Sequence, residues 1–167
     1  MELVENRTAT ARERFADAVA ACGPAMFRAA RAVLPGDADA EDAVGEAVLR
    51  AWRAWGTLRT TGAERAWLVK IAVNCAYEQY RKNGRVTPTD DLEALAGPAR
   101  EAPAEGLWDA VGRLERDQRI VVTLFYYEDM PLAEIARLLN VPQGTVKSRL
   151  SRARGKLREL LREEDGE

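Results

Sequence analysis

The segment that most constrains the fold of this chain lies near its middle. Residues 84–106, GRVTPTDDLEALAGPAREAPAEG, contain three prolines, three glycines and five acids. Proline and glycine interrupt regular structure, and this composition is typical of a flexible acidic linker. The chain of 167 residues is therefore divided into two parts, each about the size of one small domain.

Both parts have the residue pattern of helices. Ala and Leu are frequent, and apolar and polar residues do not alternate over the length of a strand. We therefore predict an all-α protein of two small helical domains joined by a flexible acidic linker. The predicted divisions are a flexible N-terminus at 1–10, a first domain at 11–83, the linker at 84–106 and a second domain at 107–163.

Helix breakers and capping residues divide the first domain further. They predict helices at 11–21, 25–34, 37 or 39 to 55, and 63–82. Thr10 is expected to cap the first helix, and Gly23-Pro24 is expected to interrupt or kink the chain after it. Asp37 or Asp39 is expected to cap the third helix. The apolar positions expected on the third helix are Val44, Val48, Ala51, Trp52 and Trp55.

The second domain contains the layout of a helix-turn-helix at residues 131–154. The segment 140–144 predicts a short turn, after which Thr145 is expected to cap the second helix. Two shorter helices are expected before this motif, one at 107–114 and one capped by Asp117. The first helix of the motif is predicted from an apolar seam at Leu132, Ile135, Ala136 and Leu139.

The second helix of this motif combines an apolar stripe with a cationic face. Residues 144–158 hold six cations and no acid. A helix turns by about 100° per residue, which groups the apolar residues Val146, Leu150, Ala153, Leu157, Leu160 and Leu161. The opposite side carries Ser148, Ser151 and Arg152, flanked by Lys147 and Arg149. Arg, Lys and Ser side chains reach base edges and phosphates, so this helix fits the major groove of DNA.

Positive charge is concentrated in two segments, although the net charge of the chain is −2. Residues 47–85 hold eight bases and two acids, and residues 131–162 hold the same numbers, so each segment carries +6. Two basic segments separated by an acidic one indicate two contacts with a polyanion. The alternative is a pair of solvated helix faces with no nucleic-acid role.

Enzymatic and membrane functions have little support in the sequence. The chain has no His, and its two cysteines, Cys22 and Cys75, match no metal-ligand spacing. No apolar run approaches the roughly 20 residues of a membrane span, and the N-terminus lacks the pattern of a signal peptide. We expect a soluble, cytoplasmic protein that is not an enzyme and holds no metal or cofactor.

Three segments resemble one protein family. YYEDMPLAEIARLLNVPQGTVKSRLSRARGKLREL, 126–160, resembles the C-terminal domain of extracytoplasmic-function (ECF) sigma factors of bacterial RNA polymerase. DAEDAVGEAVLRAWRAW, 39–55, resembles the sigma segment that docks on the polymerase, and AWLVKIAVNCAYEQYRK, 66–82, the segment that recognises the promoter −10 element. The resemblance implies a protein that joins core RNA polymerase, opens promoter DNA at the −10 element and binds the −35 element.

The resemblance also implies partners and sites. The expected partners are core RNA polymerase, promoter DNA and an anti-sigma factor, with no insertion into a membrane. Residues on the core-docking pattern are Asp39, Asp42, Glu46, Arg50 and Trp52. Residues on the −10 pattern are Leu58, Arg59, Thr61, Lys70 and Asn74. Residues on the −35 pattern are Thr145, Lys147, Ser148, Arg149, Ser151 and Arg152.

Three positions depart from the family pattern. Gly45 stands where the docking motif usually has Gln, and a glycine inside a helix costs about 1 kcal/mol relative to Ala. Leu58 replaces a Phe at the start of the base-binding loop, and Glu64 replaces a common aromatic residue. Gly45 predicts weaker binding to core polymerase, and the other two leave the preferred −10 base open.

Two other functions remain at this point. One is a stand-alone transcription factor with a helix-turn-helix output domain, which would need a sensor or receiver domain. The N-terminal part has no strand-helix alternation of the kind a receiver needs. The other is a sigma-like regulator that binds core polymerase poorly because of Gly45.

Overall fold

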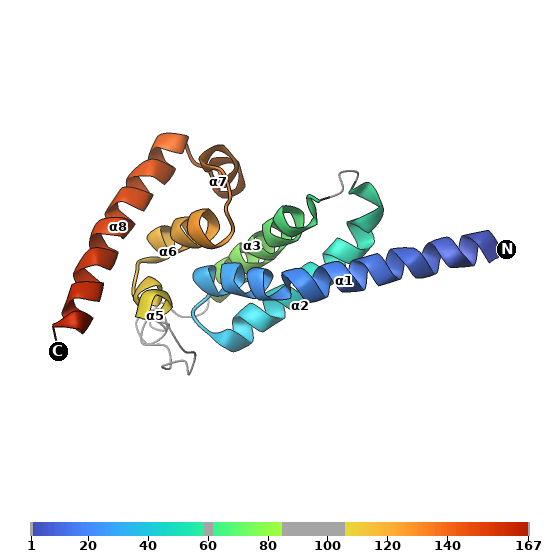
Figure 1. Cartoon of the computed structure of the whole chain (residues 1–167), viewed down its shortest axis with the longest axis horizontal. Helices are drawn as coiled ribbons and strands as arrows, with labels where there is room; N and C mark the ends of the chain where they lie inside the picture. The colour runs from blue at the N-terminus through green and yellow to red at the C-terminus, as the bar shows by residue number, and fades with distance from the viewer. Residues whose placement is uncertain (1, 59–61, 85–105, 167) are drawn as a thin grey trace.

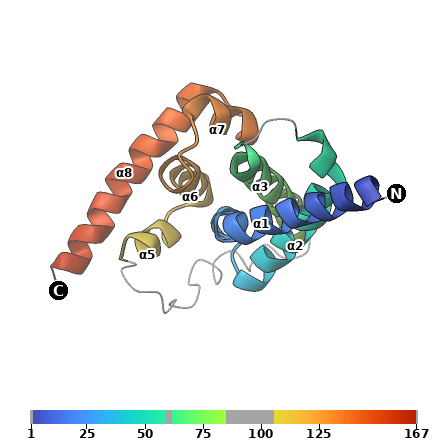
Figure 2. The same cartoon turned by 45° about the vertical axis from the view of Figure 1, so that its right-hand side comes forward.

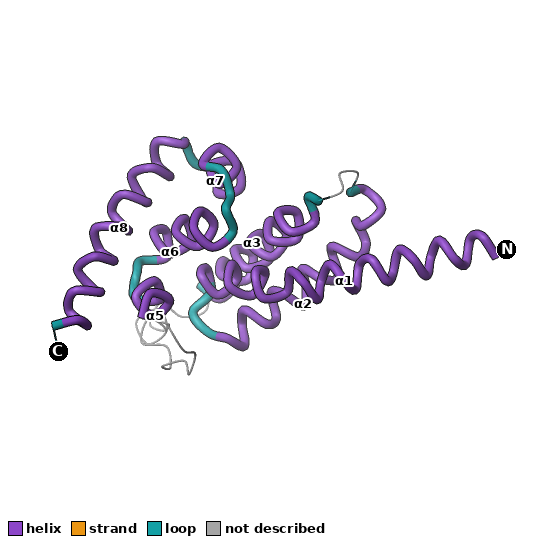
Figure 3. The backbone as a smooth tube through the Cα atoms, viewed as in Figure 1, coloured by secondary structure: helices purple, strands orange, loops and turns teal. Residues whose placement is uncertain are grey.

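The computed structural model describes residues 2–58, 62–84 and 106–166, with side chains from residue 10 onward. Within these ranges all regular structure is helical and no strand occurs (Figure 3). The prediction of an all-α fold made of two helical domains is confirmed. The segment 85–105, which holds nearly all of the predicted linker, lies outside the described residues.

The first domain is a bundle of three helices. It consists of α1 (Glu2–Val33), α2 (Asp37–Ala54), a short 3-10 turn η1 (Trp55–Thr57) and α3 (Glu64–Asn83). Helix α1 packs against both α2 and α3, and its N-terminal turns extend beyond the bundle (Figure 1). The buried side of α3 includes Leu68, Val69 and Ala72, which belong to the core of the bundle.

Helix α1 is one continuous helix, which corrects the prediction of two shorter ones. It begins at Glu2 rather than after Thr10, and it passes through Pro24 without a break. A proline inside a helix removes one hydrogen-bond donor. Buried residues on both sides of it, Cys22 and Met26 among them, pack into the core and hold the helix together.

Small residues form the buried face of α2, which differs from the predicted face. Ala51 is fully buried as expected, but Val44 and Val48 are only partly buried and Trp52 is 40% exposed. Because the distance between packed helices depends on the side chains between them, a line of alanines lets α2 lie close to its neighbours. The fully buried residues of α2 are Ala40, Ala43, Ala47 and Ala51.

The second domain places a long helix against three short ones. It consists of α5 (Gly106–Gly112), α6 (Arg116–Val122), a π-helical turn η2 (Thr123–Tyr127), α7 (Leu132–Leu139) and α8 (Gln143–Asp165). Helix α8 contacts α5, α6 and α7. Helices α7 and α8 with the turn between them form the predicted helix-turn-helix, and Asn140 makes that turn with a left-handed φ of 56°.

The residues that precede the helices differ from the predicted caps. Helix α2 follows Gly36 instead of using Asp37 or Asp39, α6 follows Glu115 instead of Asp117, and α8 follows Pro142 instead of Thr145. None of these three positions makes a side-chain capping bond. Acidic residues still lie in the first turns of α2 and α6, where they favour the helix dipole.

The end of α6 widens into the π-helical turn η2. The backbone N–H of Glu128 donates to the carbonyl of Thr123 at 3.2 Å, which is a bond across five residues. Asp129 then takes a left-handed φ of 51°, a conformation that Asp tolerates better than most residues. The chain reverses here and enters α7, so Glu128 stands at the corner between α6 and α7.

The two domains pack directly on each other. Helix α6 and the turn η2 lie against α1, as both views show (Figures 1 and 2). The buried apolar residues of the two domains form one cluster. The guanidinium of Arg116 also lies over the ring of Tyr80 on α3, 3.6 Å from its centroid.

Arginines of the second domain bind the last carbonyls of α1. Arg116 Nε donates to Val33 O at 2.9 Å, and Arg119 Nε donates to Ala32 O at 2.7 Å. Arg119 also donates to Leu114 O at 3.1 Å and is buried, and burial lowers its pKa to about 10. The last carbonyls of a helix lack partners within the helix and carry the negative end of its dipole, so two guanidinium groups stabilise this end.

No helix in the described part of the chain combines the length and the apolar character that a membrane crossing requires.

Enlarging one buried alanine of α2 tests the close packing of the first domain. We expect Ala47→Leu to lower the free energy of unfolding by about 1–3 kcal/mol, because the larger side chain overfills a fully buried position. Ala38→Leu is the matched control, since Ala38 is exposed on the same helix, and it should change the value by no more than about 0.5 kcal/mol. Denaturation followed by circular dichroism measures both. Equal effects of the two variants would contradict the packing.

Candidate nucleic-acid interface

Helix α8 presents the predicted polar face to solvent. Val146, Leu150 and Ala153 are buried, as are Leu157 and Leu160, while Leu161 is partly buried. The apolar stripe predicted from the sequence is therefore the side that packs on the domain. On the other side Lys147, Ser151 and Arg152 are exposed, and Thr145, Ser148 and Arg149 are partly buried.

Two of these six polar residues make contacts within the domain. The hydroxyl of Ser148 donates to the carbonyl of Thr145 at 3.0 Å. Arg149 lies 3.7 Å from a carboxylate oxygen of Asp117, at the start of α6. These contacts hold both side chains beside the first turns of α8, whereas Lys147 and Arg152 extend into solvent.

A hollow lies next to the start of α8 and adds a cation that the sequence analysis did not single out. It has a volume of about 500 Å³ and is lined by α7 and the following turn, with Arg137, Asn140 and Gln143 among its residues. Arg137 is exposed on α7. Its position could have been predicted from its place opposite the apolar seam of α7.

The candidate −10 residues lie on α3 and on the loop before it. Leu58 is partly buried at the end of η1, while Arg59 and Thr61 lie outside the described residues. Lys70 and Asn74 are one turn apart on α3, and Asn74 is exposed. Lys70 forms an ion pair with Glu134 of α7, 2.5 Å from nitrogen to oxygen, so the second domain reaches this face of α3.

The candidate docking residues of α2 fall into two groups. Asp39, Asp42, Glu46 and Arg50 follow one another at helical spacing along one side of α2, with Asp42 and Glu46 exposed. Trp52 lies elsewhere on the helix, with its ring 5.0 Å from that of Phe15 on α1. Leu49 is 54% exposed. Helix α2 therefore offers an acidic side and an exposed apolar pair.

Arg50 links α2 to α3. Its two terminal nitrogens donate to the two carboxylate oxygens of Glu78 at 3.1 Å and 2.6 Å, and its Nε donates to Glu46 at 3.1 Å. The bonds to Glu78 and Glu46 raise the pKa of Arg50, and the bond from Arg50 lowers the pKa of Glu78. Asp39 accepts a bond from Gln79 of α3 at 3.2 Å. Two candidate docking residues thus also position α2 on α3.

Gly45 leaves open space on the surface of α2. A Cβ atom built at this position would meet no atom within 4 Å. The residue is exposed, one turn before Leu49 and two turns before Trp52. A larger side chain is therefore compatible with the fold at Gly45.

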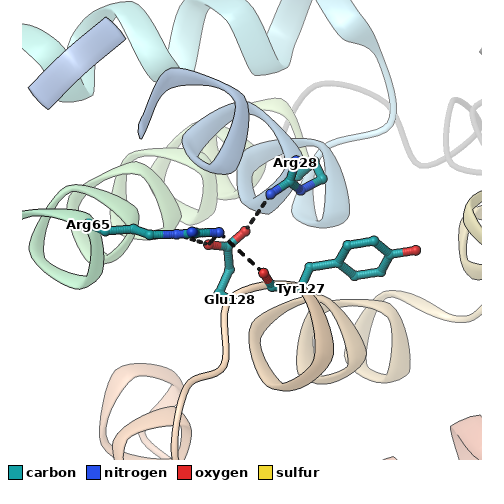
Figure 4. Close-up of polar contacts among 4 residues, drawn as sticks. All are labelled: Arg28, Arg65, Tyr127 and Glu128. Carbon is teal, nitrogen blue, oxygen red and sulfur yellow. Dashed lines mark hydrogen bonds and ion pairs between the residues drawn. The ribbon is translucent and has the colours of Figure 1, made fainter. Parts of the chain in front are cut away.

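A buried carboxylate lies between the domains, and no sequence pattern pointed to it. The side chain of Glu128 is 2% exposed and lies between two arginines of the first domain (Figure 4). It accepts from Arg28 at 3.2 Å and from Arg65 Nε at 3.0 Å. Arg65 also donates to the carbonyl of Tyr127 at 3.3 Å. Single-sequence patterns carry no signal for this pairing, because the partners are 100 and 63 residues apart.

Other kinds of chemistry find no site among the described residues. Burial raises the pKa of both Cys22 and Cys75, so both thiols stay protonated and unreactive near neutral pH. Within the described ranges no group of three metal-ligating side chains is close enough to hold an ion. The polar surfaces of α8, α3 and α2 are therefore the candidate sites.

Two family models match the chain. Residues 18–86 match the model of Sigma-70 region 2, and residues 104–157 match the model of Sigma-70, region 4. The first match contains α2 and α3, and the second contains α5 to α7 and most of α8.

Curated relatives and solved structures agree with these matches. The ECF RNA polymerase sigma factor SigM of Mycobacterium tuberculosis is 36% identical over 140 residues, which are 81% of this chain and 71% of that protein. The ECF RNA polymerase sigma-E factor of Escherichia coli is 33% identical over 134 residues, 70% of each chain. The sigma factor RpoE, solved with the anti-sigma factor NepR from Bartonella quintana, matches with a TM-score of 0.70 and 27% identity, over 90% of this chain and 98% of that one. CnrH, solved with the cytosolic domain of CnrY, matches with a TM-score of 0.60 and 28% identity, over 92% of this chain and 93% of that one.

Proposed function

The chain belongs to the ECF sigma factors of the sigma-70 family, and from this premise we propose which of its residues carry out each step of transcription initiation. The protein binds core RNA polymerase, recognises the −35 and −10 promoter elements and promotes DNA melting. It acts as a regulatory subunit in the cytoplasm and not as an enzyme. The sigma-70 region 2 match in the N-terminal domain excludes a stand-alone helix-turn-helix factor with a receiver domain.

Helix α2 is the proposed docking element for core polymerase. Asp42 and Glu46 offer exposed carboxylates to a basic surface, and complementary charge favours the encounter and fixes the register. Trp52 and Leu49 add exposed apolar area beside them. Asp39 and Arg50 contribute by holding α2 on α3 as well as by any contact with the polymerase.

Helix α3 and the loop before it are the proposed −10 element. Asn74 is exposed and carries an amide that can hydrogen-bond a base edge, and Lys70 can neutralise a phosphate. Leu58, Arg59 and Thr61 complete the proposed pocket for a base that has left the stack. A cation beside an amide suits a single strand, because single strands are held by charge and by exposed bases.

Helix α8 is the proposed −35 element, and its exposed face is the observation that carries the proposal. Lys147, Ser151 and Arg152 point away from the core of a helix-turn-helix, with no bulky apolar residue among them. Recognition helices of this motif enter the major groove with their first turns. Arg152 and Lys147 can donate hydrogen bonds to guanine edges, and Ser148 and Ser151 can bond other base edges. Thr145 and Arg149 are the proposed phosphate contacts.

An anti-sigma factor is the proposed regulatory partner. One of the similar structures contains the sigma factor RpoE with the anti-sigma factor NepR, and another contains CnrH with the cytosolic domain of CnrY. The similarity to this chain extends over more than nine-tenths of both RpoE and CnrH, which supports a partner of the same kind for this chain.

Run-off transcription tests the function as a whole. The purified protein is mixed with sigma-free core polymerase and a pool of genomic promoters, and the 5′ ends are mapped. We expect defined starts that share one −35 and −10 pair. Binding to duplex DNA without any start would contradict the proposed function and would identify a DNA-binding regulator that does not engage core productively.

Arg152→Ala tests the orientation of α8. We expect it to weaken binding of the −35 duplex found by run-off mapping by about 1–3 kcal/mol, the value of a good base contact, and to relax selectivity at one position. Arg162→Ala is the matched control, since Arg162 is an exposed arginine near the far end of the same helix. Fluorescence anisotropy measures both. Full selectivity in Arg152→Ala would contradict the orientation.

Gly45→Gln tests the docking face of α2. We expect tighter binding to core polymerase, because the variant adds an amide at an open position of the docking helix. Gly45→Ala is the matched control, since it removes the same glycine, worth about 1 kcal/mol of stability in the free protein, without adding the amide, and it should bind less tightly than Gly45→Gln. Competition against a labelled sigma factor measures the affinity. Unchanged or weaker binding of Gly45→Gln would show that Gly45 does not limit docking.

A further inference from the structure

Two carboxylates of the second domain meet the cations of α3. Glu128 stands at the corner after η2, and Glu134 lies in the first turn of α7. Their partners on α3 are Arg65 and Lys70, which lie on either side of the apolar residue Val69. A cleft of about 170 Å³ lies at this contact and is lined by residues of both domains, with Arg65, Val69, Glu128 and Glu134 among them.

The contact at Glu128 is the stronger of the two. Both of its carboxylate oxygens are occupied, one by Arg28 and one by Arg65 (Figure 4). The carboxylate is almost fully buried, so solvent and salt screen its attraction to the arginines less than they screen a surface pair. The side chain of Arg65 is itself 55% exposed, so the guanidinium remains accessible from solvent on its other side.

The contact at Glu134 occupies a residue of the proposed −10 element. Lys70 is paired with Glu134 although both side chains are partly exposed. An exposed pair of this kind contributes at most about 1 kcal/mol to stability. The ion pair matters because it occupies Lys70, and an ammonium group held by a carboxylate is less available to a phosphate.

We propose that Glu128 and Glu134 act as an internal substitute for DNA phosphates and inhibit −10 binding in the free protein. Carboxylate and phosphate oxygens accept the same charge-assisted hydrogen bonds from Arg and Lys. The nucleic acid strand therefore competes with the protein's own carboxylates for Arg65 and Lys70. Arg65 is thereby a phosphate contact in addition to Lys70, which rests on the proposed function in one respect, that α3 faces promoter DNA.

The packing of the domains makes this inhibition reversible. The −10 and −35 elements are separated by more than one helical turn of DNA, whereas here α7 lies against α3 through Glu134 and Lys70. The second domain must leave α3 before both elements are bound. The same movement frees Arg65 and Lys70 for the DNA strand, so release of the carboxylates and placement of the second domain occur together.

The test measures DNA binding by the whole chain without polymerase. The probe is a fluorescein-labelled single-stranded DNA of 20 nucleotides and mixed sequence, and anisotropy is followed over a range of salt concentrations. We expect Glu128→Gln/Glu134→Gln to bind more tightly than wild type. Each phosphate contact on a single strand adds about 0.7 to the salt slope. Two released cations should therefore steepen the slope by about 1.4, so that the added affinity falls about sevenfold between roughly 50 mM and 200 mM salt.

Three further variants make the result specific. Glu163→Gln/Asp165→Asn removes the same charge from exposed positions in the last turns of α8 and should leave the slope unchanged. Adding Arg65→Ala/Lys70→Ala to the double variant should abolish the gain, since it removes the released cations. Glu134→Gln alone removes only the partly exposed pair, leaves the buried Glu128 in place, and should give about half of the change in slope.

The outcomes separate this proposal from the proposed function. A slope that is unchanged in Glu128→Gln/Glu134→Gln, or changed equally in the α8 control, overturns the internal competition. If run-off transcription succeeds in that case, the sigma function stands without it. If the slope steepens as expected but no promoter start is found, the competition is supported and the sigma function fails.

Discussion

The last turn of α1 is the constraint on which the arrangement of the two domains depends. The carbonyls at a helix end need donors from elsewhere, and this end receives them from arginines. Arg31 supplies one from within the first domain, to Leu34 O at 2.8 Å. Arg116 and Arg119 supply two more from the second domain. Arg119 is buried, and in the described part of the chain its side-chain hydrogen bonds go to the carbonyls of Ala32 and Leu114. Carbonyl dipoles therefore stabilise its charge, and separating the domains would expose both the guanidinium and the end of α1 to water.

Local patterns predicted those parts of the fold that depend on local physics. The apolar stripe of α8, the helix-turn-helix and the helical character of both domains follow from periodicity and breakers, and all are present in the structure. The continuity of α1 through Pro24 and the alanine face of α2 were not predictable, because packing against other helices outweighs local preference in both. The candidate site divides in the same way. The spacing of polar residues predicted the candidate residues on α8 and α3. The ion pair between Lys70 and Glu134 could not be predicted from a single sequence, because it joins segments that are far apart in the chain.

Acidic residues have different effects in the two halves of this protein. On α2 they are exposed and available to another molecule, with Asp42 and Glu46 on the surface. Between the domains they turn inward, and Glu128 is enclosed by arginines. A net charge near zero therefore conceals an acidic side on α2 and cationic side chains on α3 and α8. Where the domains meet, Glu128 and Glu134 neutralise cations of the first domain.

The π-helical turn η2 also bears on how a chain of this kind can change in length. A bond across five residues accommodates one residue more than an α-helical turn, and Glu128 follows directly after it. Deleting that one residue would restore α-helical winding and rotate the next side chain by about 100°, away from Arg28 and Arg65. Helix α8 packs on α5 and α6, which precede this turn, and on α7, which follows it. A single-residue deletion would thus change the contact between the domains and the seating of α7 on α8 at the same time, so the length of this one turn couples the two.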